Sequence, residues 1–134
     1  MERVIMNISK VFQILGEEYK DNFDKYKSEV YTLAEYCTIP FFSKEIAYKE
    51  VNNWGTEETT DIYLLFFPEG WKVGKLTVQT GAGINKIVDN NIEAVSERGI
   101  EIWLKKQTTA DQMKMIAKAY QILEDAGKLE MLNE

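Results

Sequence analysis

Apolar and aromatic side chains recur every three or four residues along the first quarter of the chain. The positions are Ile8, Phe12, Leu15, Tyr19, Phe23, Tyr26, Val30, Leu33 and Cys37. This spacing places them on one face of an α-helix, close to the seam of a coiled coil. The pattern predicts helix over residues 5–37, as one helix or as two helices that meet near Gly16. Pro40 disfavours helical backbone at the residue before it, so the helix should end ahead of that position.

A further short helix is predicted between Ser43 and Gly55, which extends the helical region to residues 5–54. Ser43 can cap such a helix and Gly55 can end it. The segment EIAYKEV within it also alternates between two sets of side chains, which is typical of an edge strand. The sequence leaves both interpretations open and favours the helix.

The centre of the chain has the pattern of two consecutive strands. DIYLLFF (61–67) is apolar on both faces, as in a strand that is covered on two sides. PEG (68–70) is a turn signal, and WKVGKLTVQT (71–80) has the pattern of the returning strand. The apolar positions change parity at Gly74 within this second strand, which predicts a β-bulge there.

The last third of the chain is predicted to form a helix, a strand and a helix. The first helix would be closed by Gly99 and would place on one face Ile84, Ile87, Val88, Ile92 and Val95. IEIWLKK (100–106) alternates as a third strand. Thr109 and Gln112 form a capping-box pattern for a final helix that ends at Gly127.

Together these elements predict an α+β fold in which a small sheet packs against helices. The sheet is expected to be antiparallel or mixed, with three to four strands. The element order is α-α-β-β-α-β-α, with a long N-terminal helical region. The length of 134 residues and the hydrophobic content of 45% favour a single domain over residues 1–134, with its strands and helices in residues 61–126.

The composition excludes several kinds of catalytic site. The chain has no histidine, which removes Ser-His-Asp triads, Cys-His dyads and histidine zinc sites. Cys37 is the only cysteine, so no internal disulfide can form, in agreement with a reducing compartment. No complete cofactor motif or EF-hand pattern is present. We therefore expect no cofactor, no metal site and no enzymatic activity.

The charge distribution bears on partners and location. The net charge is −6, and residues 1–67 contain seven basic and twelve acidic side chains. This acidity disfavours binding to nucleic acid or to an anionic membrane. The longest apolar run, IYLLFFP, is too short to span a bilayer, and no secretory leader pattern is present, so we expect a cytoplasmic protein.

The segment VQTGAGINK (78–86) is a candidate anion-binding turn. Gly81 and Gly83 follow a strand pattern and precede the predicted helix at Ile84, with Lys86 close by. Backbone N–H groups at the start of such a helix can bind an anion. The third glycine of a dinucleotide loop and the Lys-Ser/Thr pair of a P-loop are both missing. A structural turn is therefore the favoured interpretation.

Two groups of side chains are candidates for contact with a protein partner. Glu17, Asp21 and Asp24 follow one another at helical spacing, and Tyr26 lies on the neighbouring seam. The second group contains Trp71 and Trp103, which are flanked by lysines on the predicted sheet. Exposed aromatic side chains of this kind can anchor an interface. The tyrosine-rich seam could also join two copies of the N-terminal helical region into a homodimer.

These observations favour a small acidic binding protein that acts by protein–protein contact. Inhibitors, immunity proteins and phage-type accessory (anti-defence) proteins act in this way. The alternative is a binder of small anionic ligands or nucleotides that uses the glycine turn 81–84.

Overall fold

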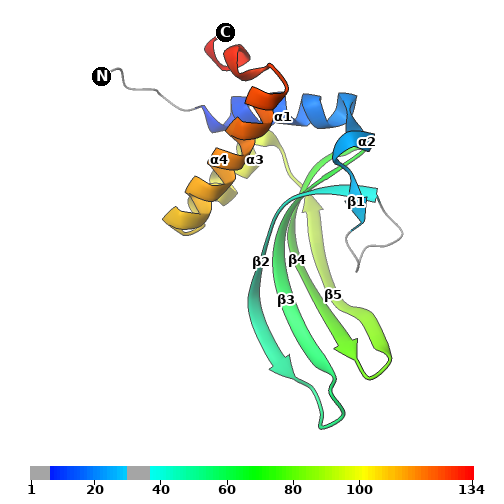
Figure 1. Ribbon diagram of the computed structural model, residues 1–134. Coiled ribbons are helices and arrows are strands. Elements are labelled where there is room, and N and C mark those ends of the chain that lie inside the picture. Colours follow the sequence, from blue (N-terminus) through cyan, green and yellow to red (C-terminus); the bar gives the residue numbers. More distant parts are fainter. Residues whose placement is uncertain (1–6, 30–36) are drawn as a thin grey trace. The chain divides into compact units, whose positions relative to one another are not determined.

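The computed structural model describes residues 7–29 and 37–134, with no side-chain description for Glu29 and Cys37. The chain divides into two compact units (Figure 1). The helical unit is formed by Met1–Phe23 with Val95–Glu134, and the sheet unit by Asp24–Ala94. The single domain expected for residues 1–134 stays a prediction. Val30 and Leu33 of the predicted seam lie outside the described residues.

The helical unit contains α1 (Ile8–Asp21), α3 (Glu97–Lys105), α4 (Thr109–Asp125) and the 3₁₀ helix η2 (Leu129–Asn133). The predicted seam is confirmed over α1, where Ile8, Phe12, Leu15 and Tyr19 are buried. Within this unit α1 contacts α3, α4 and η2. The seam side chains of α1 are therefore covered within the chain, and a homodimer through this region stays a prediction.

The prediction of helix as far as residue 37 is wrong. Helix α1 ends at Asp21, and the Asn22 N–H donates to the Glu18 carbonyl at 3.0 Å. Asp and Asn are weak helix formers because their side chains compete for backbone hydrogen bonds. The four-residue helix α2 (Phe23–Tyr26) and the short strand β1 (Ser28–Glu29) follow. Gly16 does not interrupt α1.

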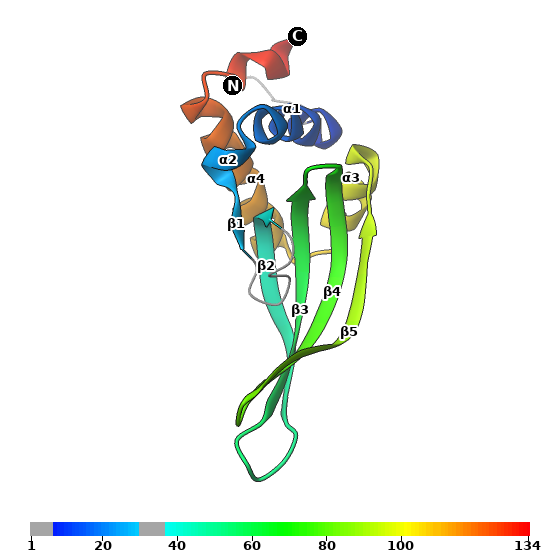
Figure 2. The same ribbon diagram turned by 90° about the vertical axis from the view of Figure 1, so that its right-hand side faces the viewer.

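Within its described residues, the sheet unit contains five antiparallel strands. Their order across the sheet is their order in the chain, as can be followed in Figures 1 and 2. Strand β1 pairs with two residues of β2, and the four long strands are β2 (Cys37–Glu50), β3 (Glu57–Phe67), β4 (Gly70–Gly81) and β5 (Ile84–Ala94). The α+β class, the antiparallel sheet and the helix-first order are confirmed. The detailed order is not, because strands replace two predicted helices and a helix replaces one predicted strand.

The helix predicted between Ser43 and Gly55 is wrong, and the edge-strand alternative is correct. This segment forms the second half of β2, which pairs with β3 from Ser43 opposite Tyr63 to Glu50 opposite Glu57. The pairing skips Phe41 and Ile46, so each of them is an extra residue in a β-bulge. The two bulges break the strict alternation that identifies a strand in a sequence.

The helix predicted from Ile84 is also wrong, because this segment is β5. Strand β4 pairs Thr77 with Asp89 and Val78 with Ile87, which leaves Val88 as a bulged residue. The bulge shifts the alternation by one residue, so Ile87 and Ile92 lie on the same face although they are five positions apart. Because of the bulge, the apolar residues of β5 are spaced irregularly along the sequence, and this spacing resembles that of the apolar face of a helix.

The strand predicted over residues 100–106 is wrong, since these residues belong to α3. The Ser96 hydroxyl caps this helix by accepting from the Gly99 N–H at 3.0 Å. Ile100 and Leu104, one helical turn apart, are buried, whereas Ile102 is 51% exposed. The alternation of these three side chains therefore did not reflect a sheet face.

The final helix is confirmed, with a different cap from the one predicted. Thr108, not Thr109, is the N-cap, and its hydroxyl accepts from the Asp111 N–H at 3.1 Å. The helix ends at Asp125. Gly127 follows with φ of 70°, and the Lys128 N–H donates to the Leu123 carbonyl at 2.8 Å. This is the αL ending that glycine favours.

The bulge predicted at Gly74 is not present, since β3 and β4 keep one continuous register along their length. Gly74 meets a different requirement. A Cβ atom there would lie 1.9 Å from the Asn91 carbonyl oxygen of β5. Only glycine lets β4 and β5 approach so closely at this point.

Candidate binding surface on the sheet

The hairpin end of the sheet, which carries the β2–β3 and β4–β5 loops, exposes side chains on both of its faces. Residues directly opposite each other in antiparallel strands point to the same face. The register between β2 and β5 therefore assigns each strand residue to one of two faces. These two faces differ in charge.

One face is acidic. Glu45 lies directly opposite Asp61, and Glu50 lies directly opposite Glu57. Between these two pairs lies the row formed by Tyr48 and Thr59. We call these six residues the acidic face. Within the described part of the chain, the register places no lysine or arginine directly opposite any of the four carboxylates.

Tyr48 is the aromatic centre of the acidic face and is 51% exposed. Its hydroxyl donates to Glu57 Oε1 at 3.0 Å. The pKa of Tyr48 is raised above 10.0, first by this hydrogen bond and further by slight desolvation and the charges of Glu57, Glu50 and Glu45. The hydrogen bond to Glu57 and the charges of the three glutamates change the pKa of this exposed hydroxyl in the same direction.

One of the two carboxylate oxygens of Asp61 is an acceptor without a hydrogen-bond donor among the described residues. Its Oδ2 accepts from the Tyr63 hydroxyl at 3.4 Å, whereas the buried Oδ1 has no hydrogen-bond partner among the described residues. A buried acceptor without a donor is unfavourable. The acidic face thus combines two like-charged pairs with an acceptor that lacks a donor.

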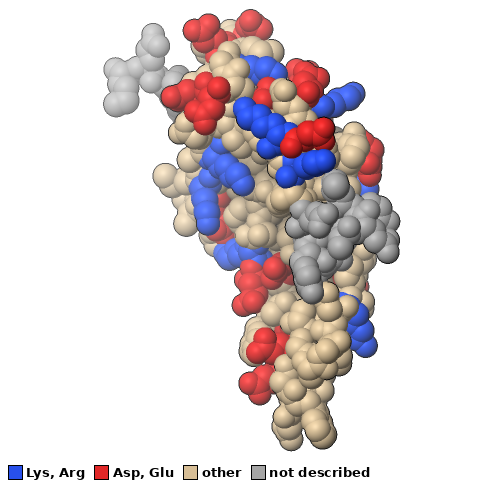
Figure 3. Space-filling model, turned by 45° about the vertical axis from the view of Figure 1, so that its right-hand side comes forward, with Lys and Arg blue, Asp and Glu red and all other residues tan. Residues whose placement is uncertain are grey.

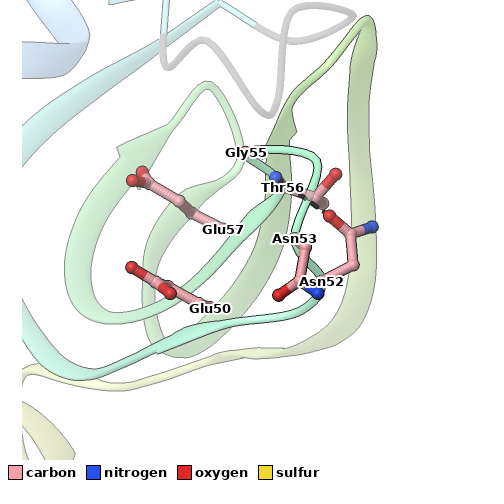
Figure 4. Close-up of a pocket in the computed structure, with 6 residues that line it drawn as sticks. All are labelled: Glu50, Asn52, Asn53, Gly55, Thr56 and Glu57. Carbon is pink, nitrogen blue, oxygen red and sulfur yellow. Dashed lines mark hydrogen bonds between the residues drawn. The ribbon is translucent and has the colours of Figure 1, made fainter.

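The loop beyond the acidic face presents Trp54, which is 81% exposed. The Asn52 side chain holds the loop, because its Oδ1 accepts from the Trp54 N–H at 2.8 Å and from the Thr56 N–H at 3.4 Å. A cavity of about 330 Å³ lies here, lined by Glu50, Asn52, Asn53, Gly55, Thr56 and Glu57. Figure 4 shows Glu50 and Glu57 extending to the same side from neighbouring strands.

The opposite face of the same strands carries lysines. We call it the lysine face, and it contains Lys44, Lys49, Lys75 and Lys86, all exposed. Here the charges are compensated in part. Lys49 lies opposite Glu58 and contacts it at 3.2 Å, and Gln79 donates to Glu58 at 3.0 Å. The Gln79 hydrogen bond, followed by Lys49, lowers the pKa of Glu58 below its ordinary value.

Between the lysines lies a row of small side chains. It contains Ala47, Thr60 and Thr77, with Asp89 at its outer end. The hydroxyls of Thr60 and Thr77 are 2.9 Å apart and hydrogen-bonded.

Figure 3 shows carboxylates along one side of the hairpin end, whereas its tip carries no charge.

The glycine turn is not a strand-to-helix corner. Gly81 pairs with Ile84, so Ala82 and Gly83 form a two-residue hairpin turn, with φ of 51° and 80°. Positive φ at both central residues is what a type I′ turn requires. Lys86 lies on β5 opposite Gln79. The anion-binding interpretation loses the helix N-terminus on which it depended.

The predicted acidic partner residues are divided between the two units. Glu17 and Asp21 are exposed on α1 of the helical unit. Asp24 and Tyr26 lie on α2 of the sheet unit, where Asp24 pairs with Lys27 at 3.2 Å. The helical spacing that connected Asp24 to the first two residues ends with α1.

The two predicted tryptophan contacts do not share a sheet. Trp71 is 4% exposed and packs edge-on against Phe41 and Phe66, so its indole belongs to the core. Trp103 is half-buried on α3. The sequence interpretation missed Trp54, although the Asn-Asn-Trp-Gly stretch that contains it is a loop signal.

Comparison with models of protein families, with curated protein sequences and with solved structures gives no match to this chain. Within the described residues, none of the helices combines the length and the apolar character needed to cross a bilayer.

Proposed function

We propose that the protein is a non-enzymatic binding protein whose acidic face binds a basic surface of a protein partner. One observation carries this proposal: two pairs of carboxylates, Glu45 with Asp61 and Glu50 with Glu57, lie directly opposite each other on one face. The three glutamates are exposed, and Asp61 is half-buried beside Leu76. Like charges in this position are unfavourable, by up to about 1 kcal/mol per pair. A partner that supplies lysine or arginine converts the repulsion into charge-assisted hydrogen bonds.

Aromatic side chains support the same conclusion. Tyr48 stands between the two carboxylate pairs, and Trp54 projects from the adjoining loop. Tyrosine and tryptophan are the residues most often found at the energetic centres of interfaces. Neither has a role in the core, because both are largely exposed. The arrangement supports an aromatic anchor surrounded by charges that select a basic partner.

We propose the kind of activity that the composition favours, with the binding surface on the sheet. Stoichiometric binding of this kind is how an inhibitor, an immunity protein or a phage-type accessory protein acts. We propose a cytoplasmic location, which the single cysteine supports.

A comparison of three baits from native-host extract tests the proposal. The baits are the unmodified protein, the double variant Glu50→Lys/Glu57→Lys and the control Glu17→Lys/Asp21→Lys. Both variants change the net charge equally, but only the first reverses the acidic face. We expect a basic protein to be recovered in stoichiometric amount with the unmodified protein and the control, and to be lost with the first variant. Equal recovery with all three baits contradicts the proposal.

A further inference from the structure

We propose that the lysine face is the docking surface for the acidic face of a second copy of this chain, so that copies associate head-to-tail. This inference rests on the proposed function in one respect, since it takes the acidic face to bind basic surfaces. It adds the opposite face as a second binding surface and names its occupant.

The two faces carry net charges of opposite sign, in rows that are equally spaced along the strands. On the acidic face, the rows Glu45–Asp61 and Glu50–Glu57 are separated by one row without charge. On the lysine face, the row of Lys44 and Lys75 and the row of Lys49 and Lys86 are also separated by one row. Glu58 lies within the second of these rows and Asp89 at the end of the separating row, so the four lysines outnumber two carboxylates on this face. Because both faces belong to the same strands, the separation between the charged rows is the same on each. Complementary charge patterns of this kind fix the register of an interface.

The rows between the charges also match in size. The acidic face has the large, half-exposed side chain of Tyr48 in its middle row. The lysine face has the small side chains of Ala47, Thr60 and Thr77 in the corresponding row, with Asp89 at its outer end. A ring that projects from one sheet can therefore enter the shallow row of the next. Interdigitation of large and small side chains is how two sheet faces pack.

Association through the strand edges is disfavoured by the structure. All three bulged residues, Phe41, Ile46 and Val88, lie on β2 and β5, the long strands at the margins of the sheet. The internal pair β3 and β4 has no register shift. Bulges and lysines on outer strands are the usual means of preventing edge-to-edge pairing. Of the surfaces of the sheet, its two faces are thus better suited than its edges to contact between copies.

The contact joins different surfaces on the two copies, so it does not close into a symmetric dimer. The pair keeps one unoccupied lysine face on one copy and one unoccupied acidic face on the other, so assembly can continue. A basic partner competes with the second copy for the acidic face. Self-association therefore limits partner binding at high concentration of the protein and low salt.

Sedimentation velocity with three variants tests this proposal. Lys75→Glu/Lys86→Glu reverses the lysine face, and Tyr48→Ala/Glu50→Gln/Glu57→Gln removes the acidic face. Lys106→Glu/Lys114→Glu is the control, because it changes exposed lysines of the helical unit by the same charge. We expect the unmodified protein and the control to form species larger than a dimer at about 20 mM salt, and to dissociate at about 500 mM, where charges are screened within a few ångströms.

Each face variant alone is expected to be monomeric, and an equimolar mixture of the two is expected to give a dimer and nothing larger. The mixture has one intact acidic face and one intact lysine face, so it forms a single contact. Circular dichroism establishes that each variant is folded, and Lys75→Gln/Lys86→Gln replaces the first variant if it is not. A monomeric unmodified protein at low salt, or a mixture that stays monomeric, overturns the proposal.

The two proposals fail separately. The Lys75→Glu/Lys86→Glu variant retains the acidic face, so it should bind an oligo-arginine peptide even though it does not self-associate. A protein that binds this peptide but is monomeric in every condition refutes the lysine-face proposal alone. A protein that self-associates through neither face and binds no peptide refutes both.

Discussion

Glu50 and Glu57 lie directly opposite each other at the ends of β2 and β3, next to the loop that presents Trp54. The backbone pairing holds the two side chains on the same face, and both are exposed. Neither side chain belongs to the buried core, and Glu57 accepts a hydrogen bond from the exposed Tyr48 hydroxyl. A local conflict that the fold does not need is typical of a functional surface.

Removing one charge of this pair should stabilise the protein. We expect Glu50→Gln to raise the free energy of unfolding by about 0.5 kcal/mol at low salt, because the opposite like-charged pair is relieved. Denaturant unfolding measures the change. The gain should shrink at about 1 M salt, where the charges are screened.

Glu58→Gln is the matched control for that substitution. Glu58 is adjacent to Glu57 in the chain but points to the lysine face, where Lys49 and Gln79 contact it. We expect this change to reduce the free energy of unfolding, since a complementary charge is lost. Changes of the same sign for both substitutions would contradict the assignment of these residues to two electrostatically different faces.

The ionisation of Tyr48 reports the field of the acidic face. Its pKa is raised, so its contribution to stability is complete below the ordinary tyrosine value, about 10, and is lost as the pH rises through the folded-state pKa. We expect Glu57→Gln to lower the pKa of Tyr48 toward the ordinary value, because the carboxylate acceptor is removed. A spectrophotometric titration, taken as the difference from Tyr48→Phe, measures it. An unchanged pKa would show that Glu57 does not act on this hydroxyl.

Gly74 and Gly83 should respond differently to alanine. At Gly74 the new Cβ would collide with the backbone of Asn91 and Ile92, which cannot move without opening the β4–β5 pairing. We expect Gly74→Ala to cost about 3 kcal/mol or to prevent folding. Gly83→Ala meets no atom within 4 Å and carries only the strain of its φ of 80°, about 1 kcal/mol. Thermal unfolding of both variants compares them, and equal losses would mean that the close strand approach is incorrect.

The ion pair between Glu18 and Lys128 should contribute to the stability of the helical unit. The Glu18 side chain is buried, its carboxylate lies 2.8 Å from Lys128 Nζ, and Asn22 donates to it at 3.2 Å. Lys128→Met leaves this carboxylate without its cation, and we expect a loss of about 1–3 kcal/mol. Lys128→Arg, which keeps the charge, should lose less. Equal losses would show that the charge is not what matters.

The same pair gives a pH dependence with a definite sign. Glu18 raises the pKa of Lys128. The stabilisation is therefore complete below the ordinary lysine value, about 10.4, and is lost as the pH rises through the folded-state pKa. The difference in unfolding free energy between the unmodified protein and Lys128→Met should thus narrow at alkaline pH. A constant difference would contradict this linkage.

The regular elements could be predicted from the sequence because each has one uninterrupted period. Helix α1 repeats its apolar residues every three or four positions, and the second half of β3 is apolar on both faces. The polar first half of β3, from Glu57, was not predicted as strand. The β3–β4 hairpin was also found, since PEG separates two regular strands. Helix α4 was identified by its caps and its period, with an error of one residue at the start.

The remaining elements were misassigned where the pattern is interrupted or too short. Ile46 and Val88 are bulged residues, and each shifts the alternation of its strand by one position. Helix α3 is nine residues long, so a few alternating side chains were enough to imitate a strand. A periodic pattern assumes that every residue occupies the next position of the strand. A bulged residue has no partner on the neighbouring strand, so the pattern after it is shifted by one residue.

The acidic face could not be predicted from the sequence, because it depends on long-range register. Glu50 and Glu57 become neighbours only if residues 43–50 form a strand that pairs with β3. If residues 43–50 are assigned to a helix, Glu50 and Glu57 are not predicted to be neighbours. Trp54 is a different case, because its exposure follows from its place in a polar loop, which the sequence does show.

The central claim is that the acidic face is the surface that binds a basic partner, and a titration with an oligo-arginine peptide tests it most directly. The measurement is the dissociation constant at about 50 mM salt for Glu50→Gln/Glu57→Gln and for Glu17→Gln/Asp21→Asn, two variants that lose the same charge from exposed positions. We predict that the sheet variant binds about tenfold more weakly than the unmodified protein, a change of about 1.4 kcal/mol, while the helix variant changes by less than about twofold. Equal weakening in the two variants would contradict the account, since it would show that the peptide responds to net charge and not to the acidic face.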